Sequence, residues 1–555
     1  MEQKERIEMY ALENAILHEG RAEIQAVLNH LFKDGLEKDK IKDVMPEIQE
    51  AIKKVNKLGI KEQHEEIKKY SQEISKIEEE KKARERTGLP ELENVKIGKI
   101  VTRLAPEPSK YNHIGHALSF LLNYLYAKKY KGKCLLRFED TNPEKVSQEY
   151  IDAMKEDVLD YLNIKVKSIR YVSDDMKKFY AYAEKIIKLG KAYMCFCEQE
   201  KLKKLREDGI ECSCRQQDAK KNLAEWKKFL KNEYKKNQAT LRIKGNMQSN
   251  NYVMRDSILF RAIDVEHYRH KKKYKVWPMF DFYNPIEDHL MKITHILRSN
   301  EFDVRVELQE HIKELLDLRK QTIVHYGRFN VIGMITQGRD IRERIEKKEM
   351  LGWDDPRLAT LRAMKRRGIL KETFYQLTEQ AGLSKHPVNL SFDMISSINR
   401  KLLDPIAERY YFVYSPVKLK IKNKPDIKEI EVKIHPEKQE RRKLSIGEIF
   451  ISQEDYEKNI SKEVRLMHLF NIKLKKNNEA DFTSLENKDI SKIQFVSNFV
   501  KARVLMPDGN WIDGIADEGI KNLKIGSIIQ FERFGFVRLD RINEAGEYEF
   551  WFSHR

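Results

Sequence analysis

The spacing of hydrophobic residues changes along the chain and divides it into regions of different secondary structure. Over residues 1–95 the apolar positions recur at helical spacing, for example in "YALENAILHEG" and "EIQAVLNHLF". The charged stretch "KEQHEEIKKYSQEISKIEEEKKARER" predicts a long helix or a hinge, and "TGLPELEN" marks a boundary near residue 90. We therefore expect a helical N-terminal domain.

A strand, a turn, a helix and a second strand are predicted next. The β-branched run "VKIGKIVTRLAP" ends in Pro106, and Pro108 follows, so a helix is barred there. In "ALSFLLNYLYAKKY" the leucines recur at helical spacing, Gly132 breaks the pattern, and "KCLLRFED" is strand-like. This order predicts a βαβ unit whose first loop lies at the carboxyl end of a strand, where ligands bind in open α/β sheets.

The rest of the chain mixes all three patterns. Residues 194–275 form a lysine-rich insertion of mixed character, and "YKVWPMFDFYNP" at its end is strand-like. Residues 325–385 are predicted to be largely helical. From about residue 395, short β-runs separated by Gly, Pro, Asn and Asp recur, as in all-β barrels.

Composition and charge narrow the class of protein. A length of 555 residues suits roughly three to five domains. The net charge of +18, spread along the chain, favours a polyanionic partner, although a basic protein with solvated lysines is the alternative. The N-terminus is charged, no apolar run is long enough to span a membrane, and the five cysteines suit a reducing compartment. We expect a cytoplasmic protein without a membrane segment.

His113 and His116 flank Gly115 at the start of the predicted helix. A helix N-terminus offers free N–H groups and a positive dipole end, which favour phosphate. Glycine lets a flat base approach the backbone, and imidazoles three positions apart share a helix face, so both could reach one phosphate chain. The alternative is a pair of surface histidines with local hydrogen bonds.

Four of the five cysteines lie within "YMCFCEQEKLKKLREDGIECSCR" as two C-x-C pairs. Four thiolates can complete a tetrahedral zinc site, although the more usual knuckle is C-x-x-C. The alternative is four ordinary reduced cysteines. The candidate ligands are Cys195, Cys197, Cys212 and Cys214. Cys134, in an apolar strand, is expected to be a core residue.

The motifs occur in an order that resembles the class I aminoacyl-tRNA synthetases. "PEPSKYNHIGH" resembles their HIGH motif, and "LLRFEDTNPE", "WPMFDFYNPIEDHLMKITHILR" and "LGWDDPRLATLRAMKRRGI" resemble the glutamyl/glutaminyl subgroup. "ALENAILHEGRA" and "IIQFERFGFVRLDRI" are similar to archaeal-type glutamyl-tRNA synthetases. The resemblance implies a multidomain fold with an α/β Rossmann catalytic domain, a helical N-terminal domain and all-β C-terminal barrels that bind the anticodon.

On this basis we divide the sequence into six segments. They are a helical N-terminal domain (1–95), the first half of the Rossmann catalytic domain (96–193), an acceptor-stem-binding insertion with the cysteines (194–275), the second catalytic half (276–325), a KMSKS-like loop with a helical connector (326–394) and the anticodon-binding β-barrels (395–555).

The resemblance also assigns residues to the two substrates. It implies that ATP is bound by His113, Gly115, His116 and the Arg328 of "YGRFN". It implies that the glutamate pocket is bordered by Arg103, Ala105, Glu107, Glu139, Phe280, Asn284 and Arg298. Glu139 is expected to pair with the substrate's α-ammonium group. Phe280 stands where the subgroup usually has tyrosine, so one hydroxyl contact is missing.

Arg298 is expected to select the amino acid. A guanidinium has only donors and matches a carboxylate with two parallel hydrogen bonds, whereas a glutamine amide would turn its own donors towards it. The alternative is that Arg298 pairs only with Glu301 or Asp303.

The KMSKS-like loop departs from the family pattern. Its positions correspond to Thr336, Gln337, Gly338, Arg339 and Asp340, so Gly338 and Asp340 replace the two lysines. We expect a slow enzyme in which a neighbouring arginine, Arg339 in the first place, takes over the phosphate contact.

The implied function is ATP-dependent attachment of L-glutamate to tRNA(Glu) through a glutamyl-adenylate, with Mg²⁺ and, in some relatives, structural zinc in the insertion. Whether tRNA(Gln) is also charged stays open. We expect a monomer. The alternative function is a catalytically impaired tRNA-binding paralogue, or a glutamyl donor to another pathway.

Overall fold

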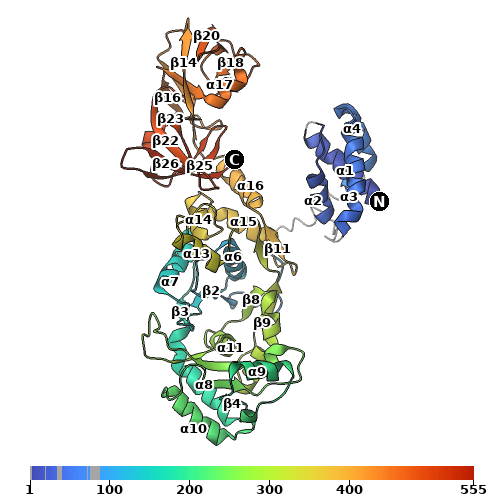
Figure 1. Ribbon diagram of the computed structural model, residues 1–555, viewed down its shortest axis with the longest axis vertical. Coiled ribbons are helices and arrows are strands. Elements are labelled where there is room, and N and C mark those ends of the chain that lie inside the picture. Colours follow the sequence, from blue (N-terminus) through green and yellow to red (C-terminus); the bar gives the residue numbers. More distant parts are fainter. Residues whose placement is uncertain (1–2, 19, 34–39, 72, 76–87) are drawn as a thin grey trace. The chain divides into compact units, whose positions relative to one another are not determined.

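The computed structural model describes residues 3–18, 20–33, 40–71, 73–75 and 88–555. The chain forms two compact units, Met1–Gly88 and Leu89–Arg555, which are described separately. Figure 1 shows their helices and strands. No helix in the described residues is both long enough and apolar enough to cross a membrane.

The first unit is helical, as the sequence predicts. Its elements are α1 (Gln3–Leu17), α2 (Ile24–Lys33), α3 (Ile41–Val55), α4 (Ile60–Glu66) and the short η2 (Ile67–Tyr70). Their apolar faces meet in one core that includes Ile7, Leu12, Val27 and Ile48. The predicted charged helix is seen only up to residue 75, because residues 76–86 lie outside the described part of the chain.

The centre of the second unit is a parallel sheet (Figure 1). Strands β1 (Val101–Leu104), β2 (Lys133–Phe138) and β3 (Ile169–Tyr171) pair in this order, and β8 (His295–Ser299) pairs with β9 (Thr322–Tyr326). The Thr294 N–H donates to the Val101 carbonyl over 3.0 Å, which sets β8 beside β1. The strand order therefore reverses between β1 and β8, where open α/β sheets bind ligands.

Helix α6 (Ile114–Lys129) connects β1 to β2, as predicted. Leu118, Leu121 and Leu122 are fully buried against the sheet. The chain then turns sharply at Gly132, where a Cβ atom would lie 2.2 Å from the Ile100 carbonyl oxygen. Only glycine lets the two segments pass so closely.

An antiparallel sheet is inserted between the two parts of the parallel sheet, β1–β3 and β8–β9. Its strands are β4 (Ala192–Cys195), β5 (Thr240–Ile243), β6 (Ile258–Ala262) and β7 (Val276–Pro278). The helices and helical turns from the end of β2 to β9 are α7 (Gln148–Lys155), η3 (Glu156–Tyr161), η4 (Val172–Asp175), α8 (Met176–Lys188), α9 (Gln199–Glu207), η5 (Ser213–Gln216), α10 (Ala219–Leu230), η6 (Tyr252–Met254), α11 (Phe280–Leu290), η7 (Asn300–Arg305) and α12 (Val306–Leu316).

The strand-like stretch 274–285 differs from the prediction in its second half. The strand ends at Pro278, and α11 begins at Phe280. Phe282, Tyr283 and Ile286 are buried together in the core of the insertion, at the three- and four-residue spacing of a helix face. Packing of this face outweighs the strand preference of the aromatic residues.

Residues 326–394 contain two short strands besides the predicted helices. Strand β10 (Phe329–Val331) pairs with β11 (Val388–Leu390). The helices of this region and the one that follows it are α13 (Gly338–Glu346), α14 (Leu361–Arg366), α15 (Lys371–Ala381) and α16 (Phe392–Leu403).

The C-terminal region is built from β-sheets, and the predicted fold class is confirmed. The seven-stranded sheet has the order β12 (Arg409–Tyr410), β24 (Ile528–Phe531), β25 (Gly535–Ile542), β26 (Tyr548–His554), β22 (Phe499–Leu505), β23 (Trp511–Asp517), β13 (Phe412–Tyr414). The six-stranded sheet has the order β17 (Ile449–Ser452), β14 (Pro416–Lys422), β20 (Glu479–Ser484), β19 (Asn471–Leu474), β18 (Glu463–Leu466), β21 (Lys492–Ile493). The remaining elements are the hairpin of β15 (Glu429–Lys433) and β16 (Arg441–Ser445), the helix α17 (Gln453–Asn459) and the turn η8 (Glu518–Asn522).

Candidate active site and metal centre

A cavity of about 670 Å³ opens at the carboxyl ends of β1 and β8. It collects residues that are far apart in the sequence. The predicted site residues that line it are Arg103, Ala105, Glu107, His113, Gly115, His116, Glu139, Phe280, Asn284, Arg298 and Arg328. Arg339 is the one predicted substrate-site residue that does not line it.

The two histidines are fixed by the start of α6. His113 is the residue that caps the helix, and its Nδ1 accepts the Gly115 N–H over 3.1 Å. His116 Nδ1 accepts the His113 N–H over 3.0 Å. Burial lowers the pKa of His113 to about 3 and the pKa of His116 well below its ordinary value. Because each Nδ1 accepts a hydrogen bond, the ring proton lies on Nε2, and both rings are neutral donors.

Gly115 makes room for a neighbouring backbone segment. A Cβ atom on this residue would lie 3.1 Å from the Phe329 carbonyl oxygen and 3.0 Å from His113 Cε1. Strand β10 can therefore approach the first turn of α6 closely only because residue 115 has no side chain.

Glu139 lies on the wall of the cavity within a buried network of charges. It accepts hydrogen bonds from Arg137 Nη2 over 2.9 Å and from Asn284 Nδ2 over 3.0 Å. Arg137 and Arg103 both donate to Asp288, over 2.7 Å and 3.1 Å. Burial raises the pKa of Glu139, and the two arginines oppose this rise.

Sequence reasoning missed Arg137 and Asp288. Arg137 lies in the otherwise apolar run "KCLLRF" of a strand, and an arginine at such a position needs a buried carboxylate partner. That anomaly was the available signal. The partner itself comes from α11, 151 residues along the chain, and no local pattern indicates it.

Arg298 is buried and lacks a carboxylate partner among the described residues. Its Nη1 donates to Gln309 Oε1 over 2.9 Å, and its Nε lies 3.4 Å from His325 Nε2. Its Nη2 is buried and has no hydrogen-bond partner in the described part of the chain. Burial, together with the charge of Arg103, lowers the pKa of Arg298 to about 10.

The two carboxylates considered as alternative partners of Arg298 are engaged elsewhere. Glu301 binds Arg328 over 2.8 Å, and Asp303 faces His325 Nδ1 at 3.2 Å. The guanidinium of Arg298 therefore presents an unsatisfied positive group at the cavity wall, which favours an anionic ligand.

Gln309 fixes the orientation of Arg298. Its amide oxygen accepts from Arg298, while its Nε2 donates to Asp281 Oδ1 over 3.2 Å. Asp281 is held in turn by Arg305 Nη1 at 2.5 Å. Because both ends of the amide are engaged, it cannot flip without losing two hydrogen bonds.

The KMSKS-like loop touches the cavity at its start. Thr336 lines the cavity, whereas the Arg339 side chain is 89% exposed and binds Glu343 over 3.0 Å. Asp340 lies in the first turn of α13, where carboxylates are favourable, and binds Arg344 over 3.0 Å. Neither Gly338 nor Asp340, which stand at the expected lysine positions of this loop, lines the cavity.

The four cysteines of the insertion converge at the end of β4. Their sulfur atoms all lie within 4.8 Å of one another, and the Cys195–Cys212 and Cys197–Cys214 sulfurs are each 3.8 Å apart. A tetrahedron with zinc–sulfur bonds of about 2.3 Å has edges of about 3.8 Å. The donor set and its spacing therefore fit zinc.

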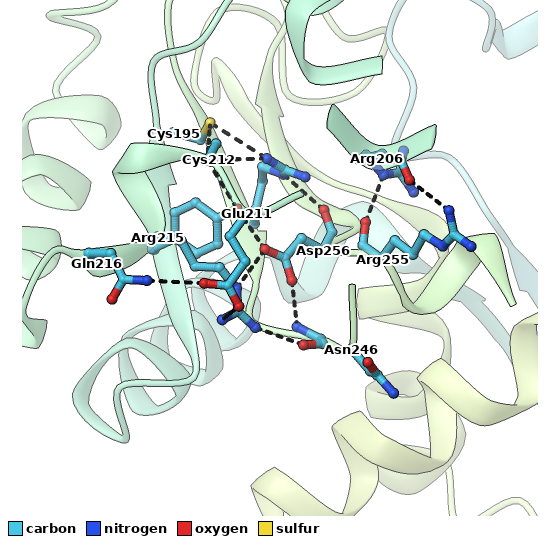
Figure 2. Close-up of polar contacts among 12 residues, drawn as sticks. Cys195, Arg206, Glu211, Cys212, Arg215, Gln216, Asn246, Arg255 and Asp256 are labelled. Carbon is cyan, nitrogen blue, oxygen red and sulfur yellow. Dashed lines mark hydrogen bonds and ion pairs between the residues drawn. The ribbon is translucent and has the colours of Figure 1, made fainter. Parts of the chain in front are cut away.

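Polar groups lie close to the sulfur atoms of Cys195 and Cys212 (Figure 2). Arg242 Nη1 lies 3.8 Å from Cys195 Sγ and 3.7 Å from Cys212 Sγ, and the Tyr193 hydroxyl lies 3.5 Å from Cys212 Sγ. A buried guanidinium beside the sulfurs stabilises thiolates, which are the form that binds metal.

Asp256 orients this surrounding layer. Its side chain accepts from the Tyr193 hydroxyl over 2.8 Å and from Arg215 Nε over 2.9 Å, and its backbone carbonyl accepts Arg242 Nε over 2.8 Å. Figure 2 shows Asp256 between Arg215 and the cysteine pair. Sequence reasoning found the four cysteines but not this layer, because Asp256 and Arg242 carry no motif.

Comparisons with known proteins agree with this architecture. Residues 99–405 match the family model "tRNA synthetases class I (E and Q), catalytic domain", and residues 407–489 and 459–540 match two models of its anti-codon binding domain. The "Glutamate--tRNA ligase" of Pyrococcus furiosus is 37% identical over 556 residues, which cover 96% of each chain. That of Methanocaldococcus jannaschii is 36% identical over 557 residues, 98% of each chain. That of Methanosphaera stadtmanae is 34% identical over 570 residues, 100% of each chain. The resemblance found in the motifs is thereby confirmed, and the chain belongs to the glutamyl and glutaminyl (E and Q) family of class I aminoacyl-tRNA synthetases.

Proposed function

We propose that this chain is a glutamate–tRNA ligase, which attaches L-glutamate to tRNA at the expense of ATP. The observation that carries the choice of amino acid is Arg298, whose buried Nη2 has no partner among the described residues. A guanidinium only donates hydrogen bonds, so the side-chain group that it binds best is a carboxylate. The curated relatives that match over nearly the whole chain bear the same activity in their names.

The reaction has two steps. An α-carboxylate oxygen of glutamate forms a bond to the α-phosphorus of ATP, the bond to the bridging oxygen breaks, and pyrophosphate leaves with the electron pair. The hydroxyl of the terminal ribose of tRNA then attacks the acyl carbon, and AMP leaves. The chemistry relies on positioning and charge neutralisation, to which Mg²⁺ carried by the phosphates contributes.

The cavity offers a partner for each end of glutamate. Arg298 receives the side-chain carboxylate, and Glu139 receives the α-ammonium group as a charge-assisted pair. Arg103 supports this wall by its bond to Asp288. The pocket is completed by Ala105, Glu107, Phe280 and Asn284.

ATP is placed at the start of α6. The neutral Nε2–H groups of His113 and His116 donate to phosphate oxygens beside the free N–H groups of the helix terminus. Arg328, exposed at the rim and bound to Glu301, adds a positive charge that can turn towards the nucleotide.

The insertion is stabilised by zinc held by Cys195, Cys197, Cys212 and Cys214. The close approach of the four sulfurs and the neighbouring Arg242 support this assignment. The ion would crosslink the end of β4 to the start of the turn η5, with 14 residues between the inner cysteines, Cys197 and Cys212. Its role is structural, because four protein ligands leave no open position.

The proposed polyanionic partner is tRNA(Glu), and the anticodon is read by the C-terminal sheets. No feature of the cavity separates tRNA(Glu) from tRNA(Gln), because both carry the same terminal ribose. We place the reaction in the cytoplasm and assign it to a monomer.

Charging of separate tRNA(Glu) and tRNA(Gln) transcripts with labelled glutamate tests this function. Acid-precipitable glutamate on tRNA(Glu), dependent on ATP, is the expected result. No charging of either transcript, with intact tRNA binding, would show that the chain binds tRNA without being a ligase.

A further inference from the structure

The KMSKS-like loop leaves a gap in the charge that the reaction needs. Gly338 and Asp340 stand where the family has its two lysines. The arginine between them, Arg339, is exposed and bound to Glu343. The negative charge that gathers on the phosphates during adenylate formation therefore lacks a cation from this side of the cavity.

Another lysine occupies the space beside Gly338. A Cβ atom built on Gly338 would lie 3.4 Å from both Cβ and Cδ of Lys110, and 3.8 Å from the Trp353 ring. The stem of Lys110 thus lies along the bare backbone at the position where the family carries a lysine side chain.

Lys110 is half-buried. It lines the same cavity as His113, Arg328 and Thr336. Its ammonium group forms no ion pair or hydrogen bond with any residue in the described part of the chain, although Glu107 is close enough to favour its charge. Burial and the charge of Arg328 lower its pKa, and its own positive charge is one of the causes that lower the pKa of His113. The ammonium is therefore near the proposed phosphate site.

The backbone next to Lys110 is held by contacts with residues 353–361, which follow the KMSKS-like loop and α13 in the sequence. The Leu361 N–H donates to the Asn112 carbonyl over 2.9 Å, and the Ile114 N–H donates to the Ala359 carbonyl over 3.1 Å. Tyr111 stacks on Trp353 with ring centroids 4.9 Å apart. These contacts hold the backbone next to Lys110 in place, so only its side chain needs to move towards a bound nucleotide.

We propose that Lys110 is a catalytic residue that supplies the phosphate-binding cation absent from position 338. As the α-carboxylate oxygen of glutamate bonds to the α-phosphorus and pyrophosphate departs, the ammonium of Lys110 neutralises the charge on the phosphate oxygens. It remains protonated throughout and transfers no proton. The assignment rests on the proposed ligase function and names one more residue of that site.

The position of the lysine can be exchanged between the two segments. Lys110→Met removes the charge and keeps the stem, Lys110→Arg keeps the charge, and Lys110→Met with Gly338→Lys returns a lysine to the loop. Lys347→Met, at the exposed end of α13, is the matched control. The assay is glutamate-dependent ATP–pyrophosphate exchange with tRNA present, and circular dichroism and tRNA affinity check the fold of each variant.

Removal of one transition-state donor lowers kcat on the order of 10²–10³-fold, which is the effect expected of Lys110→Met with little change in the KM for glutamate. Lys110→Arg and the double variant are each expected to have a kcat at least about tenfold higher than that of Lys110→Met. Lys347→Met is expected to stay within about twofold of the natural protein.

Each other outcome is informative. If folded Lys110→Met keeps the natural kcat, Lys110 is not catalytic, and the proposal is overturned. If neither Lys110→Arg nor the double variant recovers activity, the charge of Lys110 is not what catalysis uses, which also overturns it. If the natural protein itself shows no exchange with glutamate and tRNA, the ligase function fails before any variant is compared.

Discussion

Three buried arginines line or support the proposed glutamate end of the cavity, and they differ in the groups that they face. Arg103 and Arg137 share the carboxylate of Asp288. Within the described residues, the hydrogen bonds of Arg298 go only to the neutral groups of Gln309 and His325. A guanidinium in that setting gains much from a ligand carboxylate, because the alternative is a buried charge without an ion-pair partner.

Arg298→Cys is expected to raise the KM for glutamate by at least about 100-fold, since the substrate carboxylate then lacks its charged partner. The KM for ATP should change little. Steady-state exchange kinetics measure both, with the exposed Arg319→Gln as control. An unchanged KM for glutamate would remove Arg298 from the pocket.

Gln309→Glu tests how Arg298 is positioned. The new carboxylate would take over Nη1 of Arg298 and partly neutralise it, and it would face Asp281 as a like charge. We expect a rise of about 10-fold or more in the KM for glutamate, with kcat less affected. Gln309→Met, which removes the hydrogen bond without adding charge, should show the smaller effect. Equal kinetics for both variants would contradict a positioning role.

The two histidines are expected to stay neutral over the whole physiological pH range. Burial lowers the pKa of His113 to about 3, whereas an unfolded imidazole titrates near about 6.5. Between these values the unfolded chain takes up protons that the native ring does not, so this residue costs stability as the pH falls. NMR of histidine-labelled protein, with the His113 signal assigned by His113→Gln, should show no titration between about pH 5 and 8. A titration near pH 6.5 would mean that the ring is solvated.

At the level of secondary-structure elements, the predictions succeed where the decisive contacts are local. The leucines at 118, 121, 122 and 125, followed by Gly132, determine α6 almost by themselves. The strand predicted over residues 274–285 is wrong in its second half. This half forms a helix that is stabilised by a core to which distant segments contribute. The same holds for the site. A sequence motif indicates Arg298, but only the three-dimensional structure shows that Glu301 and Asp303 bind other residues and not Arg298.

The cysteine cluster makes a prediction at this level. The purified protein is expected to contain about one zinc per chain, because four sulfurs at tetrahedral spacing bind one ion. Cys195→Ser with Cys212→Ser should release it and weaken tRNA binding more than ATP binding, as the cluster lies in the insertion. Metal analysis and binding titrations measure these effects, with Cys134→Ala as control. Zinc-free protein purified without chelators would refute the assignment.

In the molecule as a whole, the second unit joins the cavity to the C-terminal sheets through α14. At its N-terminal end the Leu361 N–H bonds to Asn112 beside the histidines. At its C-terminal end Arg366 donates to both oxygens of Asp540, over 2.9 Å and 2.6 Å, and buried Arg367 donates to the Ser553 carbonyl over 2.8 Å. One short helix therefore contacts both functional regions.

The net charge of +18 leads to a prediction for the complex with tRNA. The affinity for tRNA should fall steeply as the salt concentration rises. For each phosphate contact, a tenfold increase in salt should lower the logarithm of the association constant by about 0.7–0.9. Filter binding between low and moderate ionic strength measures the slope, and glutamate binding serves as the insensitive reference. A flat salt dependence would exclude an extended basic surface.

We propose that one cavity binds both ATP and glutamate and that Arg298 in this cavity rejects glutamine. Amino-acid-dependent ATP–pyrophosphate exchange, measured with glutamate and with glutamine in the presence of tRNA, tests it most directly. We expect exchange with glutamate and a kcat/KM for glutamine that is lower by at least about 10²-fold, because the neutral amide leaves the buried guanidinium without a charged partner. Equal exchange with the two amino acids, or exchange with glutamine alone, would contradict it.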